Sequence, residues 1–514
     1  MTKATDSAPK SATPPDAQPL EERGSNRSHR PSSAAFRNFM GSNWGERPPS
    51  GATRSGAADY LGDRHAKVGQ AFPGERLVIP AGGLQTRSND TDYRFRPHSA
   101  FAHLTGLEAE SEPDAVLVLH PNSEPGPTHE AVLYFVPRAS RSSEEFYADS
   151  RYGEFWVGPR PSLEEMETVT GLRCEHIDTL KDALAKDAGA VQLRIVPGVD
   201  AAIEAHVNEV RAQAGLPEGK GAAEVDAALA ETLSELRLAK DAYEVEQMEK
   251  AVEATKEGFE NIIRALPRTV GHPRGERVIE GAFASVAREY GNGLGYETIA
   301  ASGNHANTLH WIDNSGTVRS DDLVLVDAGV ELDSLYTADI TRTLPVSGTF
   351  TPTQAKIYDA VLEAADAAFA KAAEPGVRFR QLHEAAQDVL ARHLDEWGLL
   401  PVSVEESLSP EGQQHRRWMP HGTSHHLGLD VHDCAQARQE LYQDGLLEEG
   451  MVFTIEPGLY FRADDLAVPE ELRGIGVRIE DDIVMDAPGV PRRLSEDIPR
   501  KRADVEEWIR EIQS

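Results

Sequence analysis

Residues 327–345 read DAGVELDSLYTADITRTLP and directly follow the apolar run LVLV at 323–326. The stretch places two aspartates, Asp327 and Asp339, at strand-like positions beside hydrophobic residues. Burying an ionised carboxylate without a partner is costly, so such a residue inside an apolar domain needs something that neutralises it. The stretch therefore predicts strands whose acidic residues face a compensating charge.

Two later strand-like runs also carry acids: Glu456 lies in TIEPG and Glu480 lies in GIGVRIEDD. In the second run the two-residue period of a strand places Arg478 and Glu480 on one face, and Val477 and Ile479 on the other. A single acid at a strand end most simply reaches solvent or pairs with a basic neighbour. Four such acids, together with a cluster of histidines at 419–433, favour a shared site.

That histidine-rich segment reads MPHGTSHHLGLDVHD and contains His421, His425, His426 and His432. Carboxylate oxygens with one or two imidazoles are the ligand set of first-row divalent cations such as manganese or cobalt. Four carboxylates around one dication would leave excess negative charge, so their number favours two ions. Two such ions lower the pKa of a shared water and polarise a carbonyl, which is the chemistry of amide hydrolysis.

Two other hydrolytic signatures are absent from the sequence. HEAAQ at His383 lacks the second histidine of the HExxH zinc helix, and the chain contains no GxSxG nucleophile elbow. A serine hydrolase and a zinc-helix protease are therefore disfavoured.

The chain of 514 residues is long enough for two or three domains. Residues 1–58 are rich in Ser, Pro, Ala and Gly and predict a disordered tail, although the aromatic patch AAFRNFMGSNWGE within it could dock on the body of the protein. Residues 59–235 alternate short apolar runs with helical stretches, as expected of an α/β domain. Residues 236–514 form a second domain of long helices and strands, so the fold class is α/β (α+β).

Helix-start signals are clear at two places in the second domain. Asp241 with Glu244 forms a plausible capping pair, and Thr351 precedes Pro352 at a first helical turn. These signals predict helices over the segments that begin KDAYEVEQMEKAV and TPTQAKIYDAVL.

The charge and cysteine content exclude several partners. Lys and Arg total 52 against 85 for Asp and Glu, giving a net charge of -33, which repels phosphate backbones and anionic membranes. Neither a nucleic acid nor a membrane is therefore expected as a partner. No segment approaches the roughly 20 apolar residues of a membrane span, and the N-terminus lacks a signal-peptide pattern. Only Cys174 and Cys434 are present, which is typical of a reducing compartment and predicts a cytoplasmic protein.

Taken together, these motifs resemble those of the pita-bread metallopeptidases, most closely the aminopeptidase P family. The resemblance covers roughly residues 60–495 and rests on VDAG, ADITRTLP, HGTSHHLGLDVHD, TIEPGLY and GIGVRIEDD, all in family order. It implies an N-terminal α/β domain followed by a pita-bread catalytic domain.

The resemblance also implies a set of metal ligands, which fall on Asp327, Asp339, His425, Glu456 and Glu480. By this analogy Asp339 and Glu480 bridge two ions, with Mn²⁺ as the expected metal and Co²⁺ or Zn²⁺ as alternatives. Asp327 chelates one ion, and His425 with Glu456 completes the other. Glu456 additionally accepts a proton from the bridging water as it attacks the scissile carbonyl.

Family residues outside the metal shell map onto both domains. The resemblance implies that His310, His421 and His432 orient the substrate and stabilise the tetrahedral intermediate. It implies that the same cleft is lined by Tyr296, Tyr460 and Arg478. Trp156 matches an aromatic residue that in the family reaches a neighbouring subunit's site, which implies a homodimer or homotetramer. His426 has no family match and is interpreted as a spectator.

The implied reaction is release of the N-terminal residue from peptides with proline in second position, by attack of a metal-bridging hydroxide on the Xaa-Pro amide. A prolidase acting on Xaa-Pro dipeptides shares nearly all these ligands and remains an alternative. A metal-free peptide-binding module of the same fold is a second alternative, and a metal-free creatine-type hydrolase is a third. Both metal-free alternatives predict missing acids.

One departure from the family pattern concerns Asp327 and Asp339, which are twelve residues apart, one more than in the family. We expect the turn around LDSLY to absorb the extra residue. A β-bulge would instead redirect one aspartate.

Overall fold

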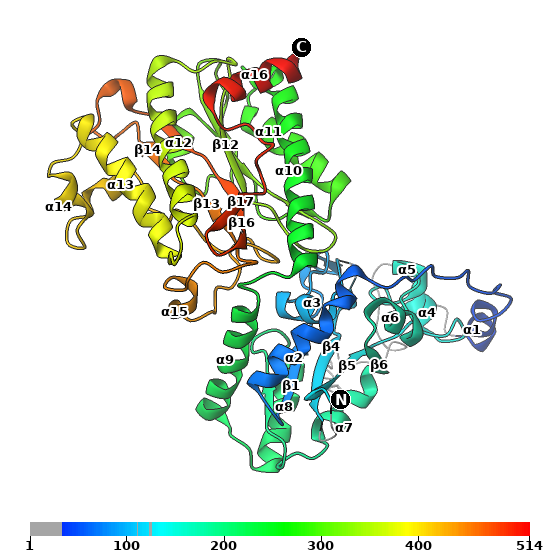
Figure 1. Cartoon of the computed structure of the whole chain (residues 1–514). Coiled ribbons are helices and arrows are strands. Elements are labelled where there is room, and N and C mark those ends of the chain that lie inside the picture. Colours follow the sequence, from blue (N-terminus) through cyan, green and yellow to red (C-terminus); the bar gives the residue numbers. More distant parts are fainter. Residues whose placement is uncertain (1–32, 110, 123–125) are drawn as a thin grey trace, which may run out of the picture.

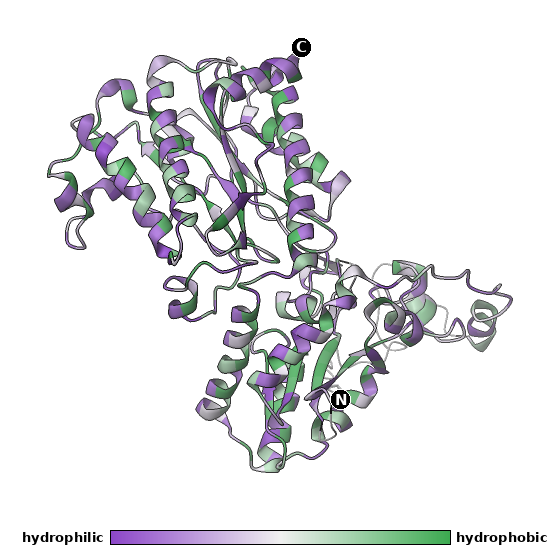
Figure 2. Ribbon diagram, in the orientation of Figure 1, coloured by the Kyte–Doolittle hydropathy of each residue, from purple (hydrophilic) through white to green (hydrophobic). Residues whose placement is uncertain are grey.

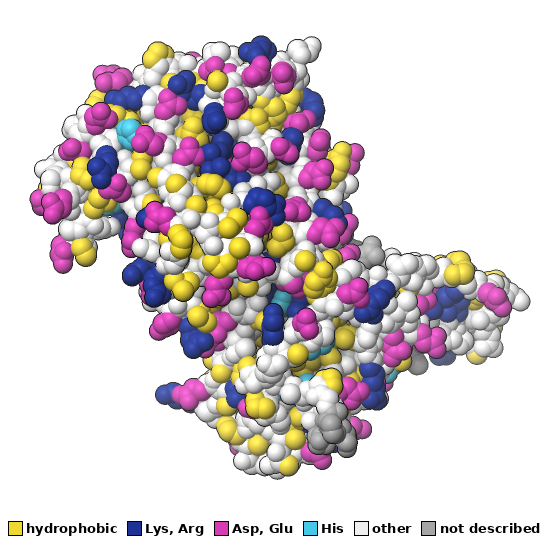
Figure 3. Space-filling model, viewed as in Figure 1, with side chains coloured by type: hydrophobic (Ala, Val, Ile, Leu, Met, Phe, Trp, Pro, Cys, Tyr) yellow, Lys and Arg dark blue, Asp and Glu magenta, His cyan; other side chains and the backbone are white. Residues whose placement is uncertain are grey.

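The computed structural model describes residues 33–109, 111–122 and 126–514, which form two domains connected through helix α9 (Gly219–Leu236) (Figure 1). In these described ranges no helix combines the length and apolar character needed to cross a bilayer. Acidic and basic side chains are interspersed over the face seen in Figure 3, so the negative net charge is not gathered into one patch on that face.

Domain one is built on a five-stranded mixed sheet with strand order β6-β5-β4-β1-β7. The strands are β1 (Arg76–Pro80), β4 (Val116–Pro121), β5 (His129–Phe135), β6 (Arg173–His176) and β7 (Leu193–Ile195). In β1, Leu77 and Ile79 enter the core on one face of the sheet and Val78 enters the core on the other. A strand covered on both faces is a continuous apolar run, and the central strands β1 and β4 are accordingly mostly hydrophobic in Figure 2.

Helices cover both faces of this sheet, which confirms the predicted α/β layers. The core on one face includes residues of α2 (Leu61–Ala71), α3 (Ser99–Thr105), α6 (Leu163–Thr170) and α9. The core on the other face includes residues of α7 (Leu180–Ala185) and α8 (Ala201–Ala214). A small hairpin of β2 (Thr86–Ser88) and β3 (Thr91–Asp92) lies outside these layers.

Residues 33–58 pack against domain one, where the short helices α1 (Ala34–Met40), α4 (Glu145–Ala148) and α5 (Glu154–Val157) lie together in Figure 1. The Trp44 ring packs edge-on against Phe146 and Phe155, with centroid distances of 5.3 and 5.8 Å. The predicted disorder therefore does not hold for residues 33–58, because their aromatic patch docks on the domain. Residues 1–32 lie outside the described residues.

Domain two begins just after α9, with helix α10 (Ala242–Thr269). Asp241 and Glu244 form the predicted capping box, and a second capping box joins Thr351 and Gln354 at the start of α12 (Pro352–Ala372). Each box satisfies backbone N–H groups that a helix start leaves without partners. Both predicted helix starts are confirmed.

The strands of domain two form two three-stranded sheets and two short pairs. The first sheet contains β9 (Ile299–Ser302), β10 (Leu323–Ala328) and β12 (Ile340–Pro345), and the second contains β13 (Val452–Ile455), β16 (Asp481–Ala487) and β17 (Val490–Arg493). The pairs are β8 (Gly293–Leu294) with β11 (Val330–Glu331), and β14 (Gly458–Phe461) with β15 (Ile475–Arg478).

A pair of long helices covers each of these sheets (Figure 1). Helix α10 and α11 (Gly275–Tyr290), with the C-terminal α16 (Arg502–Gln513), share a core with β9, β10 and β12. Helices α12 and α13 (Arg380–Glu396) share a second core with β13, β14 and β15. The short helices α14 (Val404–Leu408) and α15 (Gln439–Tyr442) lie in the connection between α13 and β13. Because each helix pair packs on the outer side of its sheet, the inner strand ends are left to form a site.

Asp327 lies in β10, and Asp339 immediately precedes the adjacent antiparallel strand β12. β10 and β12 pair without a register shift from Leu323–Pro345 to Ala328–Ile340, which brings Asp327 opposite Thr341. The chain reverses in a turn closed by the Leu332 N–H to Tyr336 carbonyl bond, in which Leu335 adopts a left-handed φ of 70°. No bulge interrupts this pairing, so the alternative of a redirected aspartate is disfavoured.

Close packing at Gly329 leaves no room for a side chain. A Cβ at this position would lie 1.7 Å from the Ala338 carbonyl oxygen. Gly329→Ala should therefore push the strands carrying Asp327 and Asp339 apart and reduce the free energy of unfolding by about 1–3 kcal/mol or more. Urea unfolding followed by circular dichroism measures this.

Gly281→Ala is the matched control, because Gly281 lies in helix α11 with open space around its Cβ position. It should be neutral or stabilising by up to about 1 kcal/mol. Equal stability of the two variants would show that the contact at Gly329 is not a constraint.

Candidate metal and active site

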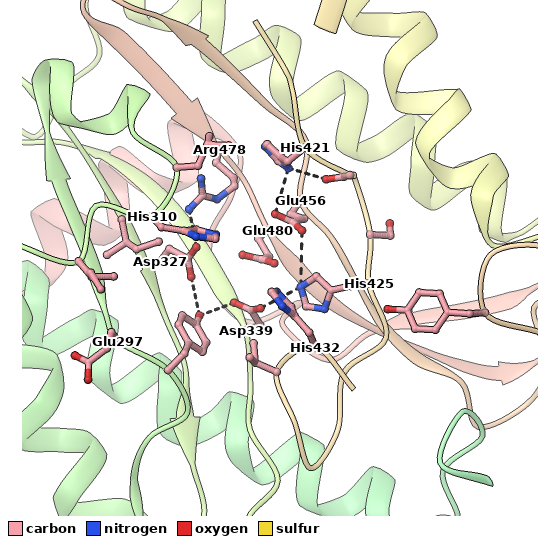
Figure 4. A pocket seen from close by; sticks show the side chains of 18 residues that line it. Glu297, His310, Asp327, Asp339, His421, His425, His432, Glu456, Arg478 and Glu480 are labelled. Atoms are coloured by element: carbon pink, nitrogen blue, oxygen red, sulfur yellow. Dashed lines mark hydrogen bonds and ion pairs between the residues drawn. The ribbon is translucent and has the colours of Figure 1, made fainter. Parts of the chain in front are cut away.

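The five residues with metal-binding side chains predicted from the sequence come from strand ends and loops that meet on the inner side of domain two (Figure 4). Asp327 lies in β10 and Asp339 immediately precedes β12. Glu456 immediately follows β13, and Glu480 lies between β15 and β16. His425 lies in the loop that precedes β13. The Thr454 N–H of β13 donates to the His425 carbonyl oxygen. Strand ends are fixed on one side by the ladder, so they hold side chains at defined positions.

Direct hydrogen bonds tie the two aspartates together. The Tyr296 hydroxyl lies 2.7 Å from Oδ1 of Asp327 and 2.5 Å from Oδ1 of Asp339. Arg478 donates from Nη2 to Oδ2 of Asp327 at 2.5 Å. The same guanidinium donates to the Tyr460 hydroxyl at 3.0 Å.

A compact group of three possible ligands lies beside Asp327. Asp339, His425 and Glu480 each offer one ligand atom, and these atoms are within 4.8 Å of one another. Nε2 of His425 is 3.3 Å from Oδ2 of Asp339 and 3.7 Å from Oε1 of Glu456. All five predicted ligands therefore face one space.

Neighbouring groups hold these ligands in place. Thr341 donates its hydroxyl to Oε2 of Glu480 at 2.8 Å, and the wholly buried Arg342 donates to the Glu480 backbone carbonyl at 2.5 Å. The Asp339 N–H donates to the carboxylate of buried Asp482 at 3.1 Å. Such outer contacts restrict the orientation of a ligand and so favour metal binding.

Burial disfavours negative charge on the carboxyl groups of this site. It raises the pKa of Glu480 well above its usual range, and the neighbouring Asp339 adds to the effect. Burial, with the charge of Asp327, also raises the pKa of Asp339. For Glu456, burial outweighs the attraction of His425 and Arg478 and raises the pKa to about 7. The positive charges of the protein therefore do not compensate these carboxylates, and burial favours their protonated form.

The histidines of the site differ in charge. Burial opposes the charge on His425, but the hydrogen bond to Asp339 and the charge of Glu456 outweigh it and raise its pKa to about 9. Burial and the positive charge of Arg478 lower the pKa of His421 to about 3. Burial and the nearby His425 lower the pKa of His432. His421 and His432 are thus neutral at pH 7.

The residues of the site fit divalent cations. The four predicted carboxyl ligands and the exposed Glu297 line the cavity, and Arg478 is the one Lys or Arg side chain among its described lining residues. Hard oxygen donors with one imidazole suit Mn²⁺-like ions. A pair of dications would favour the ionised form of each acid whose pKa burial raises.

The space enclosed by these groups is a cavity of about 620 Å³. Its lining includes Tyr296, His310, Asp327, Asp339, His421, His425, His432, Glu456, Arg478 and Glu480. Tyr460 lies just behind this wall, where its hydroxyl is 2.7 Å from Nε2 of His421. The rings of His425 and His432 are in edge-on contact, with centroids 4.5 Å apart.

Like Tyr460, two further positions named from the sequence do not line the cavity. Trp156 lies on α5 of domain one, 59% exposed, and donates its indole N–H to the Tyr147 carbonyl. Within this chain it does not contribute to the cavity. His426 is fully buried and stacks on Phe379 at a centroid distance of 4.3 Å, which agrees with its interpretation as a spectator.

Sequence reasoning missed several lining residues, namely Glu297, Ile299, Leu309, Ile312, Val431 and Tyr442. Most are apolar and come from loops, where no periodic pattern marks a residue as part of a pocket. Glu297 and Leu309 stand beside predicted site residues in the sequence, and that adjacency is the one signal that could have found them.

Known families match both domains of the chain. A model of metallopeptidase family M24 matches residues 246–487, and a model of the aminopeptidase P N-terminal domain matches residues 62–195. The fold and the site thus define a metallopeptidase, a hydrolase of family M24.

Close relatives narrow this class. The chain is 50% identical over 446 residues to Xaa-Pro aminopeptidase 1 of Streptomyces coelicolor, covering 87% of this chain and 86% of the relative. It is 32% identical over 447 residues to human Xaa-Pro aminopeptidase 3, covering 85% and 82%. The chain therefore belongs to the aminopeptidase P family of Xaa-Pro aminopeptidases.

Solved structures agree with this membership. Pseudomonas aeruginosa aminopeptidase PepP has a TM-score of 0.76 at 30% identity, covering 90% of this chain and 99% of that one. A variant of Escherichia coli aminopeptidase P in complex with substrate has a TM-score of 0.75 at 29% identity, with the same coverage. The predicted α/β domain followed by a pita-bread catalytic domain is confirmed.

The raised pKa of Glu456 predicts how the metal-free chain responds to pH. Folded Glu456 holds a proton up to about pH 7, whereas the ordinary value is 4.5. Between these two pH values the Glu456 carboxyl group takes up a proton when the chain folds. The contribution of Glu456 to the free energy of unfolding therefore falls as pH rises. The Glu456→Gln variant lacks this titration. In chelator, wild type should lose up to about 1.4 kcal/mol per pH unit more than the variant across this window.

Urea unfolding at several pH values between 4.5 and 7 provides the comparison. Equal slopes for wild type and Glu456→Gln would show that the carboxyl group is not destabilised in the folded chain.

Proposed function

We propose that the chain is a Xaa-Pro aminopeptidase that uses two divalent metal ions, with Mn²⁺ as the expected metal. It would release the N-terminal residue of peptides that carry proline in second position. The observation that carries the proposal is the convergence of five side chains, Asp327, Asp339, His425, Glu456 and Glu480, on one cavity whose described lining contains a single guanidinium. The relatives named Xaa-Pro aminopeptidase support the same substrate class.

These five residues would hold the ions. When bound, a pair of divalent cations lowers the pKa of a shared water and polarises the scissile carbonyl. The chain's own residues position the peptide and move the protons.

Glu456 is the proposed general base. Its carboxyl group lines the cavity, 3.7 Å from Nδ1 of His421 and 3.7 Å from Nε2 of His425. It would accept a proton from the attacking water and return it to the departing nitrogen. That nitrogen belongs to proline, which has no N–H in the peptide, so it leaves as a secondary amine only after gaining a proton.

Two neutral histidines, His421 and His432, line the cavity beside the proposed metal site. His421 lies in the cavity wall with Nε2 near the Tyr460 hydroxyl and Nδ1 near the Gly422 carbonyl oxygen, 2.6 Å away. His432 packs against the ring of His425. We infer that both orient the scissile carbonyl and stabilise its charge as the intermediate forms.

The proline ring would occupy the apolar part of the cavity. His310 lines this part together with Leu309, Ile312 and Val431. The free amino end would lie toward the acidic side, near the Asp327 and Tyr296 hydrogen bond. Arg478, which is itself hydrogen-bonded to Tyr460, would hold the Asp327 carboxylate in place as a ligand.

Three alternative functions would use the same cavity: a prolidase, a metal-free peptide-binding module and a metal-free creatine-type hydrolase. A prolidase would take the Xaa-Pro dipeptide alone, and a metal-free module would bind peptides without cleaving them. The filled ligand set disfavours the metal-free module and the creatine-type hydrolase, because neither needs four acids gathered in one cavity.

Assembly and location are also proposals. The exposed Trp156 is available to a second copy of the chain, which fits a homodimer or homotetramer whose subunits share a site. Both cysteines are free and buried, which fits the prediction of a cytoplasmic protein.

The substrate prediction compares an Xaa-Pro-Xaa tripeptide with an Xaa-Pro dipeptide. The chain, purified and loaded with Mn²⁺, should bind two ions per subunit and cleave the tripeptide faster. Metal analysis and product chromatography measure both. Faster cleavage of the dipeptide would favour the prolidase, and no metal with no cleavage would favour the binding module.

The metal-site prediction concerns Glu456→Ala and Asp339→Ala. Each removes a ligand, so turnover should fall by at least about 100-fold, while circular dichroism stays that of the wild type. His432→Ala, the matched control, should slow turnover but keep the full metal content. Near-normal rates in either ligand variant, or metal loss in His432→Ala, would contradict the assigned roles.

A further inference from the structure

The loop that carries His310 is tied to the protein by one buried carboxyl group. The loop comprises residues 303–316, the first part of the connection between β9 and β10. Glu276, in the first turn of α11, lies beneath it with no exposed surface. Glu276 is not among the described residues that line the cavity.

Four donors converge on the Glu276 carboxylate. Oε1 accepts from the Ser302 N–H at 2.9 Å and from Nδ1 of His305 at 2.7 Å. Oε2 accepts from the Trp311 indole N–H at 2.9 Å and from the Gly316 N–H at 2.6 Å. Because each oxygen receives two donors, the contacts secure both ends and the middle of the loop.

The close approach of Gly316 restricts the geometry of the hydrogen bonds to Glu276. A Cβ at position 316 would lie 2.6 Å from Oε2 of Glu276, so glycine is required for the approach. The Glu276 N–H also donates to the Gly316 carbonyl at 3.2 Å. A carboxylate buried this deeply is stable only while its donors remain in place.

Residues bound to Glu276 lie on both sides of His310 in the loop. The rings of His305 and Trp311, both bound to Glu276, stack on each other at a centroid distance of 4.0 Å. His310 precedes Trp311, is exposed, and lines the cavity with Leu309 and Ile312. Within the described residues no hydrogen bond from another protein group holds the His310 imidazole. Its position is therefore set by the loop backbone.

We propose that Glu276 is a positioning residue that sets substrate affinity and turnover by holding the 303–316 loop, and with it His310, against the substrate. This role rests on the proposed Xaa-Pro aminopeptidase function. Glu276 does not itself touch the substrate; it acts through the loop.

The primary test is Glu276→Gln in the metal-loaded enzyme. The amide keeps the shape but places an NH₂ group against donors, so at least one buried N–H loses its acceptor even if His305 changes tautomer. We expect kcat/KM for an Xaa-Pro-Xaa tripeptide to fall about tenfold or more. The manganese content per subunit should stay that of the wild type. The exposed Glu289 lies on the same helix, and Glu289→Gln should leave both values unchanged.

A double-mutant cycle with His310→Ala separates positioning from general structural damage. If Glu276 acts through His310, adding Glu276→Gln to His310→Ala should change kcat/KM by less than about threefold. Effects that multiply in the double variant would overturn the inference while leaving the proposed function intact. Failure of the wild type to cleave any Xaa-Pro peptide would overturn the proposed function and this role with it.

Trp311→Phe covers the case in which Glu276→Gln does not fold. It removes one of the four donors but keeps an aromatic ring against His305. We expect a fall of about threefold in kcat/KM that again disappears in the His310→Ala background. In that case an unchanged kcat/KM in Trp311→Phe, or a fall that persists in the His310→Ala background, would overturn the inference.

Discussion

Four carboxyl ligands face a single guanidinium among the described residues that line their cavity, and most of domain two is arranged around that imbalance. Burial raises the pKa of Asp339, Glu456 and Glu480, so burial alone favours protonated acids. Divalent cations reverse this preference, because each ion stabilises the ionised carboxylates that surround it. Metal bound at the proposed site would thus offset the stability that the fold gives up there.

The architecture makes such a site possible by keeping its acids on rigid elements. Each of the two helix pairs supports one sheet, and the strand ends meet between them. A layer of hydrogen bonds from Tyr296, Thr341 and Arg342 then orients the carboxylates. The carboxylates of the proposed site are thus oriented by protein contacts alone, which would reduce the reorganisation needed during a reaction.

The two sides of the cavity are supported in different ways. The acidic side is held by strand ladders, whereas the His310 side is a loop held from below by one carboxylate at four points. On the histidine-rich side, Asp433 next to His432 pairs with Arg237 of the connection between the domains, with Nε to Oδ1 at 3.0 Å. Domain one is therefore joined directly to the loop that carries His425 and His432.

Much of this protein could be predicted from local sequence. The apolar run before Asp327, the alternation around Arg478 and Glu480, and the caps at Asp241 and Thr351 each depend on neighbours within a few residues. Such signals are visible in one dimension, because strand period and capping chemistry act over short separations. The acids at strand ends and the histidine cluster likewise indicate a metal site through residue type alone. Long-range packing, by contrast, selects the side chains that meet. Glu276 and His305 are 29 residues apart, and the Tyr296 hydroxyl contacts an aspartate 43 residues further along the chain. The docking of Trp44, the apolar wall of the cavity and the place of Trp156 outside it depend in the same way on how distant elements pack. Local periodicity and residue type thus determine which segments form helices or strands and which reactive side chains they carry. Which of these elements pack against each other is decided by the burial of apolar surface over the whole chain, and no local pattern encodes it.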